Sequence, residues 1–405
     1  MTQSLDWRRI AVAAYVPTLL VSTGHGAVLP LVALTARDMG ASLEVAAFLV
    51  ALFGFGQLIG DIPAGMIASR FGEKRALVGA ALLEAAALLL CWQASEVWML
   101  GIGVFAAGLA GAVIGLARQA YLTEVVPAHQ RARALSTLGG VYRIGQFLGP
   151  MIGALVVATV NLSAAYAAAA AFSVVAAALT AALPDVQGRQ PRGTVRGPGM
   201  VTIVRSRWKA LATLGMGGMV IQLGRAARLS VLPLWAEAVG LSPETTALIF
   251  ALAALADMSM FYPSGWIMDR FGRFYSAVPT LLVLGIGFAT LPLTRGALTV
   301  TLVAILLGVA NGFSAGIVMT LGSDSAPVNA RAKFLGAWRL LTDAGNAGGP
   351  LLVSAIVALA PLWSASVAIG AVCWLGAAWF TRWLPRRPGA VRMFLDDETG
   401  PGTLK

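Results

Sequence analysis

The chain repeats itself at a fixed offset of 200 residues. Residues 61–74, DIPAGMIASRFGEK, align with 261–274, FYPSGWIMDRFGRF, and residues 131–150 align with 331–350. The same offset aligns Gly108 with Gly308. One offset that holds over separate segments indicates two copies of one structural unit. In a strongly apolar chain, a parallel two-fold repeat is typical of a membrane transporter whose site lies between its halves.

Composition identifies the solvent in which the chain folds. Hydrophobic residues make up 58% of the sequence and charged residues 12%, whereas soluble domains carry about a quarter charged residues. A spanning helix needs roughly 20 apolar residues, while barrel strands would alternate in runs of about ten. The sequence therefore predicts an all-α membrane protein with twelve transmembrane helices, over residues 10–34, 43–68, 76–94, 97–122, 134–158, 162–183, 209–235, 244–268, 274–294, 298–321, 334–360 and 362–383.

The net charge of +11 reflects membrane topology. If the N-terminus is cytoplasmic, 22 of the 29 Lys and Arg residues lie on the cytoplasmic side, whereas Arg37 and Arg295 lie outside. This asymmetry follows the positive-inside rule. We therefore expect a multi-pass protein of a bacterial-type inner membrane, with both termini in the cytoplasm and no nucleic-acid partner.

The spans and the repeat divide the chain into four segments. We expect a six-helix bundle over residues 1–184, a cytoplasmic linker over 185–207, a second six-helix bundle over 208–385 and a cytoplasmic tail over 386–405. The linker is rich in Gly, Pro and Arg, as loops are. The first span is longer than the apolar part of a signal peptide, so we expect it to remain as a permanent helix. Cys91 and Cys373 lie in spans and are expected to be buried, inert thiols.

Two loop motifs and one helix motif resemble the major facilitator superfamily. Residues 65–75, GMIASRFGEKR, resemble the loop between its helices 2 and 3, and residues 265–273, GWIMDRFGR, resemble the copy between helices 8 and 9. Residues 145–153, GQFLGPMIG, are similar to the helix 5 motif of its proton-coupled antiporters. The resemblance covers the whole chain through helix number, repeat and central linker. It implies two six-helix bundles that carry a small molecule by alternating access.

Three positions depart from the family pattern. Ser69 stands where the first loop motif usually carries Asp, Val104 where the helix 4 motif of many antiporters carries Arg, and Ala154 where the helix 5 motif ends in Gly. Arg118, deeper along the span of Val104, could substitute for the missing arginine. The antiporter mechanism therefore does not transfer residue for residue.

The resemblance assigns the two loops to gating. The gating residues are Gly65, Arg70, Gly72, Gly265, Asp269, Arg270 and Gly272. Gly72 and Gly272 can adopt positive φ in a tight turn, and Arg70 and Arg270 suit a helix C-terminus. We expect a latch that forms when the cytoplasmic side closes. The alternative is a tight turn with basic flanks.

Glycine and proline recur in the middle of two equivalent spans. The motif comprises Gly145, Gly149, Pro150 and Gly153, with Gly349 and Pro350 as the second copy. Glycines four residues apart allow close helix packing in a membrane, and a proline interrupts the helical hydrogen bonds. The sequence predicts close packing, a bend used in alternating access, or both.

Ionisable residues within apolar spans are candidates for function, because each is costly unless it faces protein, water or a partner. Candidate residues for a substrate cavity are His25, Arg143, Gln222, Arg225, Arg228, Asn311 and Arg339. Aligning residues 28–31 with 231–234 places His25 opposite Arg228 in the two copies. Arg225 and Arg228 repel each other and need an anion from elsewhere. Glu84 ranks low, because helix 3 is peripheral in the superfamily.

The candidates for proton coupling are Asp257, Asp61, Asp343 and His25. Asp257 comes first because it lies about 18 Å inside its helix and has no basic residue within four positions. Asp61 comes second, and either Arg118 or Arg339 could pair with it. Asp343 could instead pair with Arg339, which lies four residues before it. His25 titrates near neutrality when unperturbed, although a hydrogen-bonded packing role is equally open.

The sequence argues against an enzyme. It has no nucleotide-binding loop of the Walker type, and its two histidines form no metal-binding cluster with cysteines, so we expect no cofactor and no metal. A channel is an alternative, but the repeat, the paired loops and the intramembrane carboxylates suit alternating access better. We expect a monomer that moves a small molecule together with protons across the bilayer. Efflux of an amphipathic, drug-like compound is the first hypothesis, and uptake of an anionic nutrient such as an organic acid is the alternative.

Overall fold

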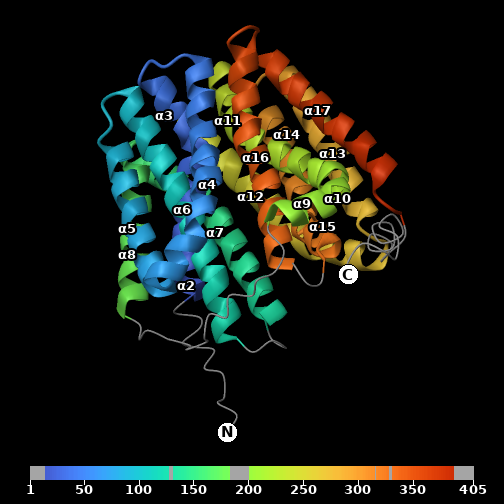
Figure 1. Ribbon diagram of the computed structural model, residues 1–405. Helices are drawn as coiled ribbons and strands as arrows, with labels where there is room; N and C mark the ends of the chain where they lie inside the picture. The colour runs from blue at the N-terminus through green and yellow to red at the C-terminus, as the bar shows by residue number, and fades with distance from the viewer. Residues whose placement is uncertain (1–13, 127–130, 183–199, 315, 328–330, 387–405) are drawn as a thin grey trace. The chain divides into compact units, whose positions relative to one another are not determined.

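The computed structural model describes residues 14–126, 131–182, 200–314, 316–327 and 331–386 (Figure 1). Within these residues the chain is helical, with short turns between helices and no strand. Because a bilayer offers no hydrogen-bond partners to exposed backbone, apolar segments of this length must satisfy their own backbone groups as helices. The all-α fold predicted from composition is therefore confirmed.

The chain divides into two compact units, called unit 1 and unit 2 below. Unit 1 comprises Met1–Arg192 and Ala236–Ala251, and unit 2 comprises Gly193–Trp235 and Leu252–Lys405. The boundary at residue 192 falls within the predicted linker, which lies partly outside the described residues, as does most of the predicted tail. Residues 236–251, expected in the second bundle, belong to unit 1, where Arg37 Nε lies 3.0 Å from Glu237 Oε1 and Ala247 packs with Leu31.

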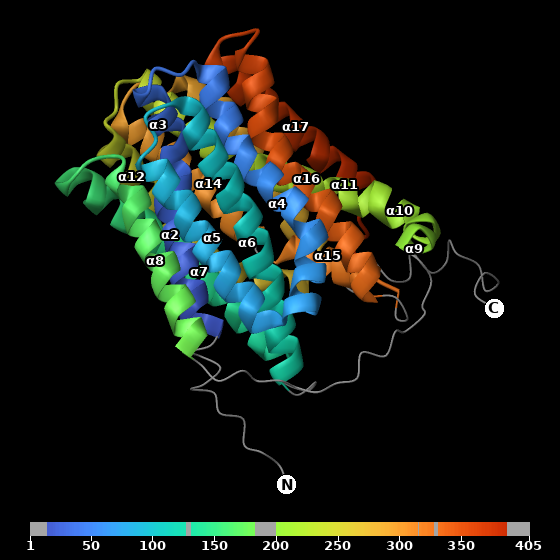
Figure 2. The ribbon, with the colours of Figure 1, turned by 60° about the vertical axis from the view of Figure 1, so that its left-hand side comes forward.

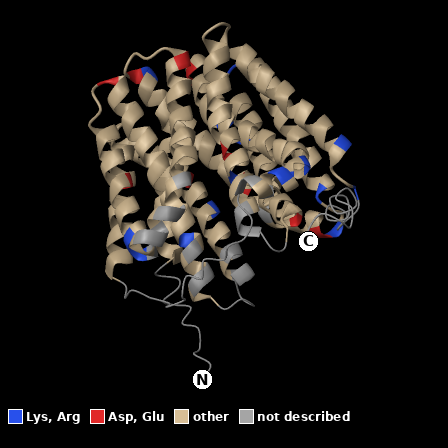
Figure 3. Cartoon of the chain, in the orientation of Figure 1, with Lys and Arg blue, Asp and Glu red and all other residues tan. Residues whose placement is uncertain are grey.

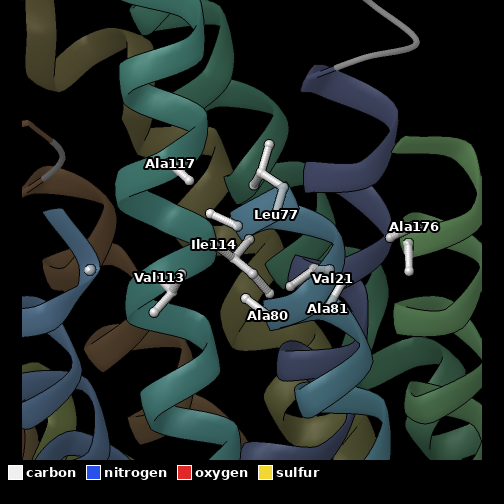
Figure 4. Packing of buried hydrophobic residues seen from close by; sticks show 11 residues of the cluster. Val21, Leu77, Ala80, Ala81, Val113, Ile114, Ala117 and Ala176 are labelled. Atoms are coloured by element: carbon white, nitrogen blue, oxygen red, sulfur yellow. The ribbon is translucent and has the colours of Figure 1, made fainter. Parts of the chain in front are cut away.

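The helices of the first part of the chain are α2 (Val16–Val28), η2 (Leu29–Leu31), α3 (Val32–Asp38), α4 (Leu43–Phe71), α5 (Glu73–Trp92), α6 (Val97–Val125), α7 (Arg131–Thr159) and α8 (Ala164–Ala182). Helix α2 packs against α7 and α8, and α5 packs against α6 and α8, as Figures 1 and 2 show. Their apolar core includes Val21, Ala80, Ile114 and Ala176, which meet from four different helices (Figure 4).

The helices of the second part are α9 (Met200–Ser206), α10 (Trp208–Ala210), the π-helical turn η3 (Leu211–Gly215), α11 (Met216–Ala238), α12 (Pro243–Arg270), α13 (Phe274–Thr290), η4 (Leu291–Leu293), α14 (Ala297–Phe313), α15 (Ile317–Ser325), α16 (Arg331–Val357) and α17 (Leu362–Trp383). Helix α13 packs against α14 and α17. Residues 236–238 of α11 and 243–251 of α12 belong to unit 1, so both helices extend across the division.

Eleven helices within the described residues are long and apolar enough to span a membrane. The seventh predicted span, over residues 209–235, is helical but is formed by α10, η3 and α11 in succession. Gln222, Arg225 and Arg228 lie in α11, which lowers its apolar character, so this segment is not among the eleven. Elsewhere the helices carry few charged residues along their lengths, as the mostly tan ribbon of Figure 3 shows.

Candidate functional site

Three ionisable side chains meet inside unit 1. His25 Nε2 of α2 lies 2.5 Å from Glu84 Oε1 of α5, and Arg118 of α6 interacts electrostatically with the same carboxylate. The exposed fractions are 7% for His25, 0% for Glu84 and 5% for Arg118. We call these three residues the unit 1 cluster. It is a buried carboxylate placed between a histidine and an arginine from two other helices.

The position of Glu84 differs from the peripheral one that the resemblance implied. Glu84 was ranked low because its helix was expected to be peripheral, yet its side chain turns inward and is fully buried. Glu84 is the one carboxylate in the apolar stretch 75–92, and a buried carboxylate requires a partner. That requirement could have singled it out. The identity of the partners could not be read, because His25 and Arg118 belong to other spans.

A second polar cluster lies in unit 2. Arg225 Nε donates to Asn311 Oδ1 at 2.6 Å, and Arg225 Nη1 donates to Gln222 Oε1 at 2.8 Å. Asn311 Nδ2 in turn donates to Asp257 Oδ2, and Arg228 interacts electrostatically with Asp257. These five residues, the unit 2 cluster, come from α11, α12 and α14. Asp257 was the first candidate for proton coupling, and the other four were candidates for the substrate cavity.

Asp257 is not isolated, contrary to expectation. No basic residue is near it in sequence, but folding brings Arg228 of α11 and the amide of Asn311 of α14 to its carboxylate. A nearby cation and a donated hydrogen bond both stabilise a charged carboxylate. The mid-helix position that suggested a proton carrier therefore holds a carboxylate that interacts with a guanidinium and accepts a hydrogen bond from an amide.

The remaining ionisable candidates are Arg339, Asp343, Asp61 and Arg143. Arg339 Nε donates to Asp343 Oδ2 at 3.2 Å, which forms the i,i+4 pair that the spacing allowed. The carboxylate oxygens of Asp61 are buried, while Arg118, one of its two expected partners, interacts with Glu84. Arg143 lies on α7 and is partly buried.

The two loops of the repeat adopt the expected turn at their glycines. Gly72 has φ +83° and Gly272 has φ +102°, so the prediction of positive φ at both positions is confirmed. In the second loop, the guanidinium of Arg270 lies 5.5 Å from the centre of the Trp266 ring. The side-chain surroundings of Gly65 and Arg70 lie outside the described residues.

An ion pair in the second loop involves Arg273 and Asp324, which were not among the expected gating residues. Arg273 Nε lies 3.1 Å from Asp324 Oδ2 of α15, and its Nη1 donates to the carbonyl of Met268 at 2.9 Å. Asp269 is more distant, at 3.9 Å from Arg273 Nη1. The pair ties the turn after α12 to α15 within unit 2. In the sequence, the alignment of Asp324 with Glu124 at the 200-residue offset could have indicated that this carboxylate has a role in the repeated unit.

The glycines of the helix motif bring backbones into close contact. A Cβ atom at Gly149 would lie 2.6 Å from the Ala27 nitrogen of α2, and one at Gly153 would lie 2.9 Å from the Ala27 carbonyl oxygen. Gly145 also faces the backbone of α2. In unit 2, a Cβ at Gly349 would lie 2.8 Å from the Ala227 nitrogen of α11. These contacts leave no room for a side chain and support the packing interpretation.

Helices α7 and α16 continue through the prolines of the motif. Pro150 lies inside Arg131–Thr159, and Pro350 lies inside Arg331–Val357. Both helices are therefore uninterrupted in this structure, and a bend used in transport stays a prediction.

The two clusters differ in the chemistry that they allow. The unit 1 cluster can bind or release a proton between an imidazole and a carboxylate, because both titrate. The unit 2 cluster has two guanidinium groups and one carboxylate, with amide groups between them, so it can hold a polar or anionic group of a ligand. Within the described residues, no group of three or more His, Cys, Asp and Glu side chains has the arrangement of a metal site.

The chain is similar to known membrane transporters. The multidrug resistance protein MdtH of Yersinia pestis (strain Pestoides F) is 26% identical over 339 residues, which cover 82% of each protein. A crystal structure of a POT family transporter in complex with a thioalcohol conjugated peptide matches with a TM-score of 0.78 at 13% identity, covering 93% of this chain and 96% of that one. The inward open xylose transporter XylE from E. coli matches with a TM-score of 0.73 at 16% identity, covering 97% and 99%.

The family model described as Major Facilitator Superfamily matches residues 15–350, which include both copies of the loop motif and both clusters. The solved structures share the fold over nearly the whole chain. The protein therefore belongs to the Major Facilitator Superfamily, and it is a multi-pass membrane transporter and not an enzyme.

Proposed function

We propose that this protein is a proton-coupled secondary transporter that exports a small amphipathic, drug-like molecule by alternating access. The observation that carries the proposal is the similarity to a multidrug resistance protein over 82% of both chains. The glycine motif of α7, which resembles that of proton-coupled antiporters, supports the same direction. We further propose a monomer in a bacterial inner membrane, with both termini in the cytoplasm.

The unit 2 cluster is our proposed contact surface for the substrate. Transporters of this architecture bind substrates near the middle of the membrane, and Asp257 lies near the middle of the 28-residue helix α12. Arg225, Gln222 and Asn311 form one hydrogen-bonded chain that ends at this carboxylate. Such a preformed chain of polar groups can orient a ligand while apolar helix surface contacts the rest of it.

Purified protein in liposomes that enclose a pH-sensitive dye provides the test of export. With an imposed pH gradient, addition of a transported compound should produce a proton flux that depends on the protein. A strain that lacks the gene, grown against a panel of toxic amphipathic compounds, should become sensitive to the same compounds. Export is wrong if the deletion strain tolerates the panel as well as its parent and no compound of the panel produces a flux.

A second candidate function, proton-coupled uptake of an anionic nutrient, is favoured by Arg228. Its Nε and Nη1 atoms are buried and have no hydrogen-bond partner within the described residues. With Arg225 nearby in sequence, the unit 2 cluster has two guanidinium groups for one carboxylate. A bound anion would supply the missing negative charge.

The linkage between proton and substrate separates the two candidates. In proton-coupled uptake of an anion, the proton and the anion would travel together. A cation would instead compete with the proton. Uptake of labelled organic acids should therefore increase with an inward proton gradient if the second candidate holds. Such uptake should be absent from the same liposomes if the protein exports amphipathic compounds.

A further inference from the structure

The charges of the unit 1 cluster are not needed for packing. Glu84 aligns with Leu284 at the 200-residue offset, and the turns that bound the two helices are also equivalent, since Gly72 and Gly272 both have positive φ. Leu284 and Glu84 are each 0% exposed. Unit 2 therefore fills the same buried position with an apolar side chain.

The surroundings of the unit 1 cluster make its charges costly. One turn away on the same helices lie Val21 before His25, Ala80 before Glu84 and Ile114 before Arg118, all members of the apolar core in Figure 4. Taking charges out of water costs several kcal/mol for each ion, and apolar replacements of buried ion pairs are often neutral or stabilising. A role other than stability is therefore the better explanation for these three residues.

Glu84 of α5 contacts His25 directly, and Arg118 of α6 interacts electrostatically with that carboxylate. On the other sides, the Phe53 ring of α4 lies edge-on at 5.3 Å between centroids. Gly111 of α6 places no side chain against the His25 ring, although a Cβ atom there would lie 3.4 Å from His25 Cε1. The same Cβ would lie 3.9 Å from the uncharged amide of Gln57. His25 thus contacts a carboxylate and an aromatic ring, and the guanidinium of Arg118 interacts with the same carboxylate.

We propose that the His25–Glu84 pair, with Arg118 as its fixed counter-charge, is a proton-binding site inside unit 1 and carries the coupled proton. With Glu84 ionised and His25 neutral, the cluster has no net charge. One added proton, shared between His25 Nε2 and Glu84 Oε1, gives it a single positive charge, and its loss restores the neutral state. Because the two groups are in direct contact, the proton belongs to the pair.

The proposal assigns different tasks to the three residues. His25 and Glu84 exchange the proton, whereas Arg118 is a positioning residue that keeps Glu84 ionised when the proton has left. Asp257 then serves the substrate and not the proton. This inference rests on the proposed function in one respect, namely that transport is coupled to protons.

Histidine NMR provides a test that does not depend on transport. The chain has two histidines, His25 and His129, so a His129→Gln protein with labelled histidine reports His25 alone. We expect the labelled histidine signal to respond to pH, with a midpoint that moves in the Glu84→Gln variant. A His25 that does not titrate, or a midpoint unchanged by Glu84→Gln, would overturn the proposal.

Liposome assays then test coupling. In His25→Gln and Glu84→Gln, substrate-induced proton flux should fall to the level of liposomes without protein. In Glu84→Gln, exchange of labelled substrate without a gradient should stay within about threefold of wild type, a change of less than 1 kcal/mol. Proton flux at the wild-type level in either variant would refute the assignment. If wild-type protein shows no proton flux, the proposed function fails, and the NMR titration still decides whether the site binds a proton.

A double variant covers the case in which a single substitution prevents folding. Glu84→Leu with Arg118→Leu removes both buried charges together and introduces at position 84 the residue that unit 2 carries there. It should fold, exchange substrate and lack proton coupling. A merely structural cluster predicts instead that exchange and coupling fall in parallel.

Discussion

Asn311 of α14 donates a hydrogen bond to Asp257 of α12 inside unit 2. At the 200-residue offset these positions correspond to Gly111 and Gln57 of unit 1, which also lie close together, since a Cβ at Gly111 would be 3.9 Å from Gln57 Nε2. The same pair of helix positions is therefore in contact in both units. It carries an uncharged amide beside His25 in unit 1 and a carboxylate beside Arg228 in unit 2.

Substitution of Asp257 should affect the substrate more than the proton. Asp257→Asn removes the charge opposite Arg228, so we expect the KM for the transported compound to change by about tenfold, which corresponds to 1.4 kcal/mol. The number of protons moved per substrate should stay the same. Both quantities can be measured in liposomes, with Glu96→Gln, an exposed carboxylate, as the control. If exchange persists while gradient-driven accumulation disappears, Asp257 carries the proton and the unit 1 assignment is wrong.

Neighbouring glycines of α16 provide a matched test of helix packing. Gly349→Ala places a Cβ 2.8 Å from the Ala227 nitrogen, whereas a Cβ at Gly348 meets nothing within 4 Å. We expect Gly349→Ala to cost about 1–3 kcal/mol through overpacking and to lower the thermal midpoint of the purified protein in detergent. Gly348→Ala should leave the midpoint unchanged or raise it slightly. Equal midpoints for the two variants would show that α11 can move away from α16 without cost.

Substitution of Gly72 tests the loop through its backbone alone. Gly72 has φ +83° and ψ 154°, a region that is essentially restricted to glycine, and a Cβ there meets nothing within 4 Å. Gly72→Val should therefore strain the turn by about 1–3 kcal/mol and slow transport several-fold while membrane insertion remains normal. The control is Gly79→Val on α5, where a Cβ is also unobstructed and the backbone is helical. Normal transport by Gly72→Val would reduce this loop to a connector.

Cysteine labelling tests the orientation expected from the charge asymmetry. The native thiols Cys91 and Cys373 are buried and should give little background. In intact cells, an impermeant thiol reagent should label Gly296→Cys, in the turn before α14, and should reach Asp269→Cys, whose side chain is 86% exposed, only after permeabilisation. The reverse pattern of labelling would place the N-terminus outside.

The sequence by itself determined the features that depend on local or periodic properties. Apolar runs fixed the helices because a membrane leaves the backbone no other way to satisfy its hydrogen bonds. The 200-residue repeat predicted that the loop glycines Gly72 and Gly272 share a conformation, and both have positive φ. The pair Arg339 and Asp343 also followed from spacing, because residues four apart lie on one face of a helix.

Tertiary structure decided which ionisable groups meet. His25, Glu84 and Arg118 belong to three helices, and nothing in their spacing shows that α2, α5 and α6 bring them to one point. For the same reason, Asp257 was predicted to be isolated although Arg228 and Asn311 face it from α11 and α14. The polarity of a single span indicates that a partner is required, because a buried charge is costly. The packing of helices then selects the partner, and with it the residues that could hold a proton or a substrate.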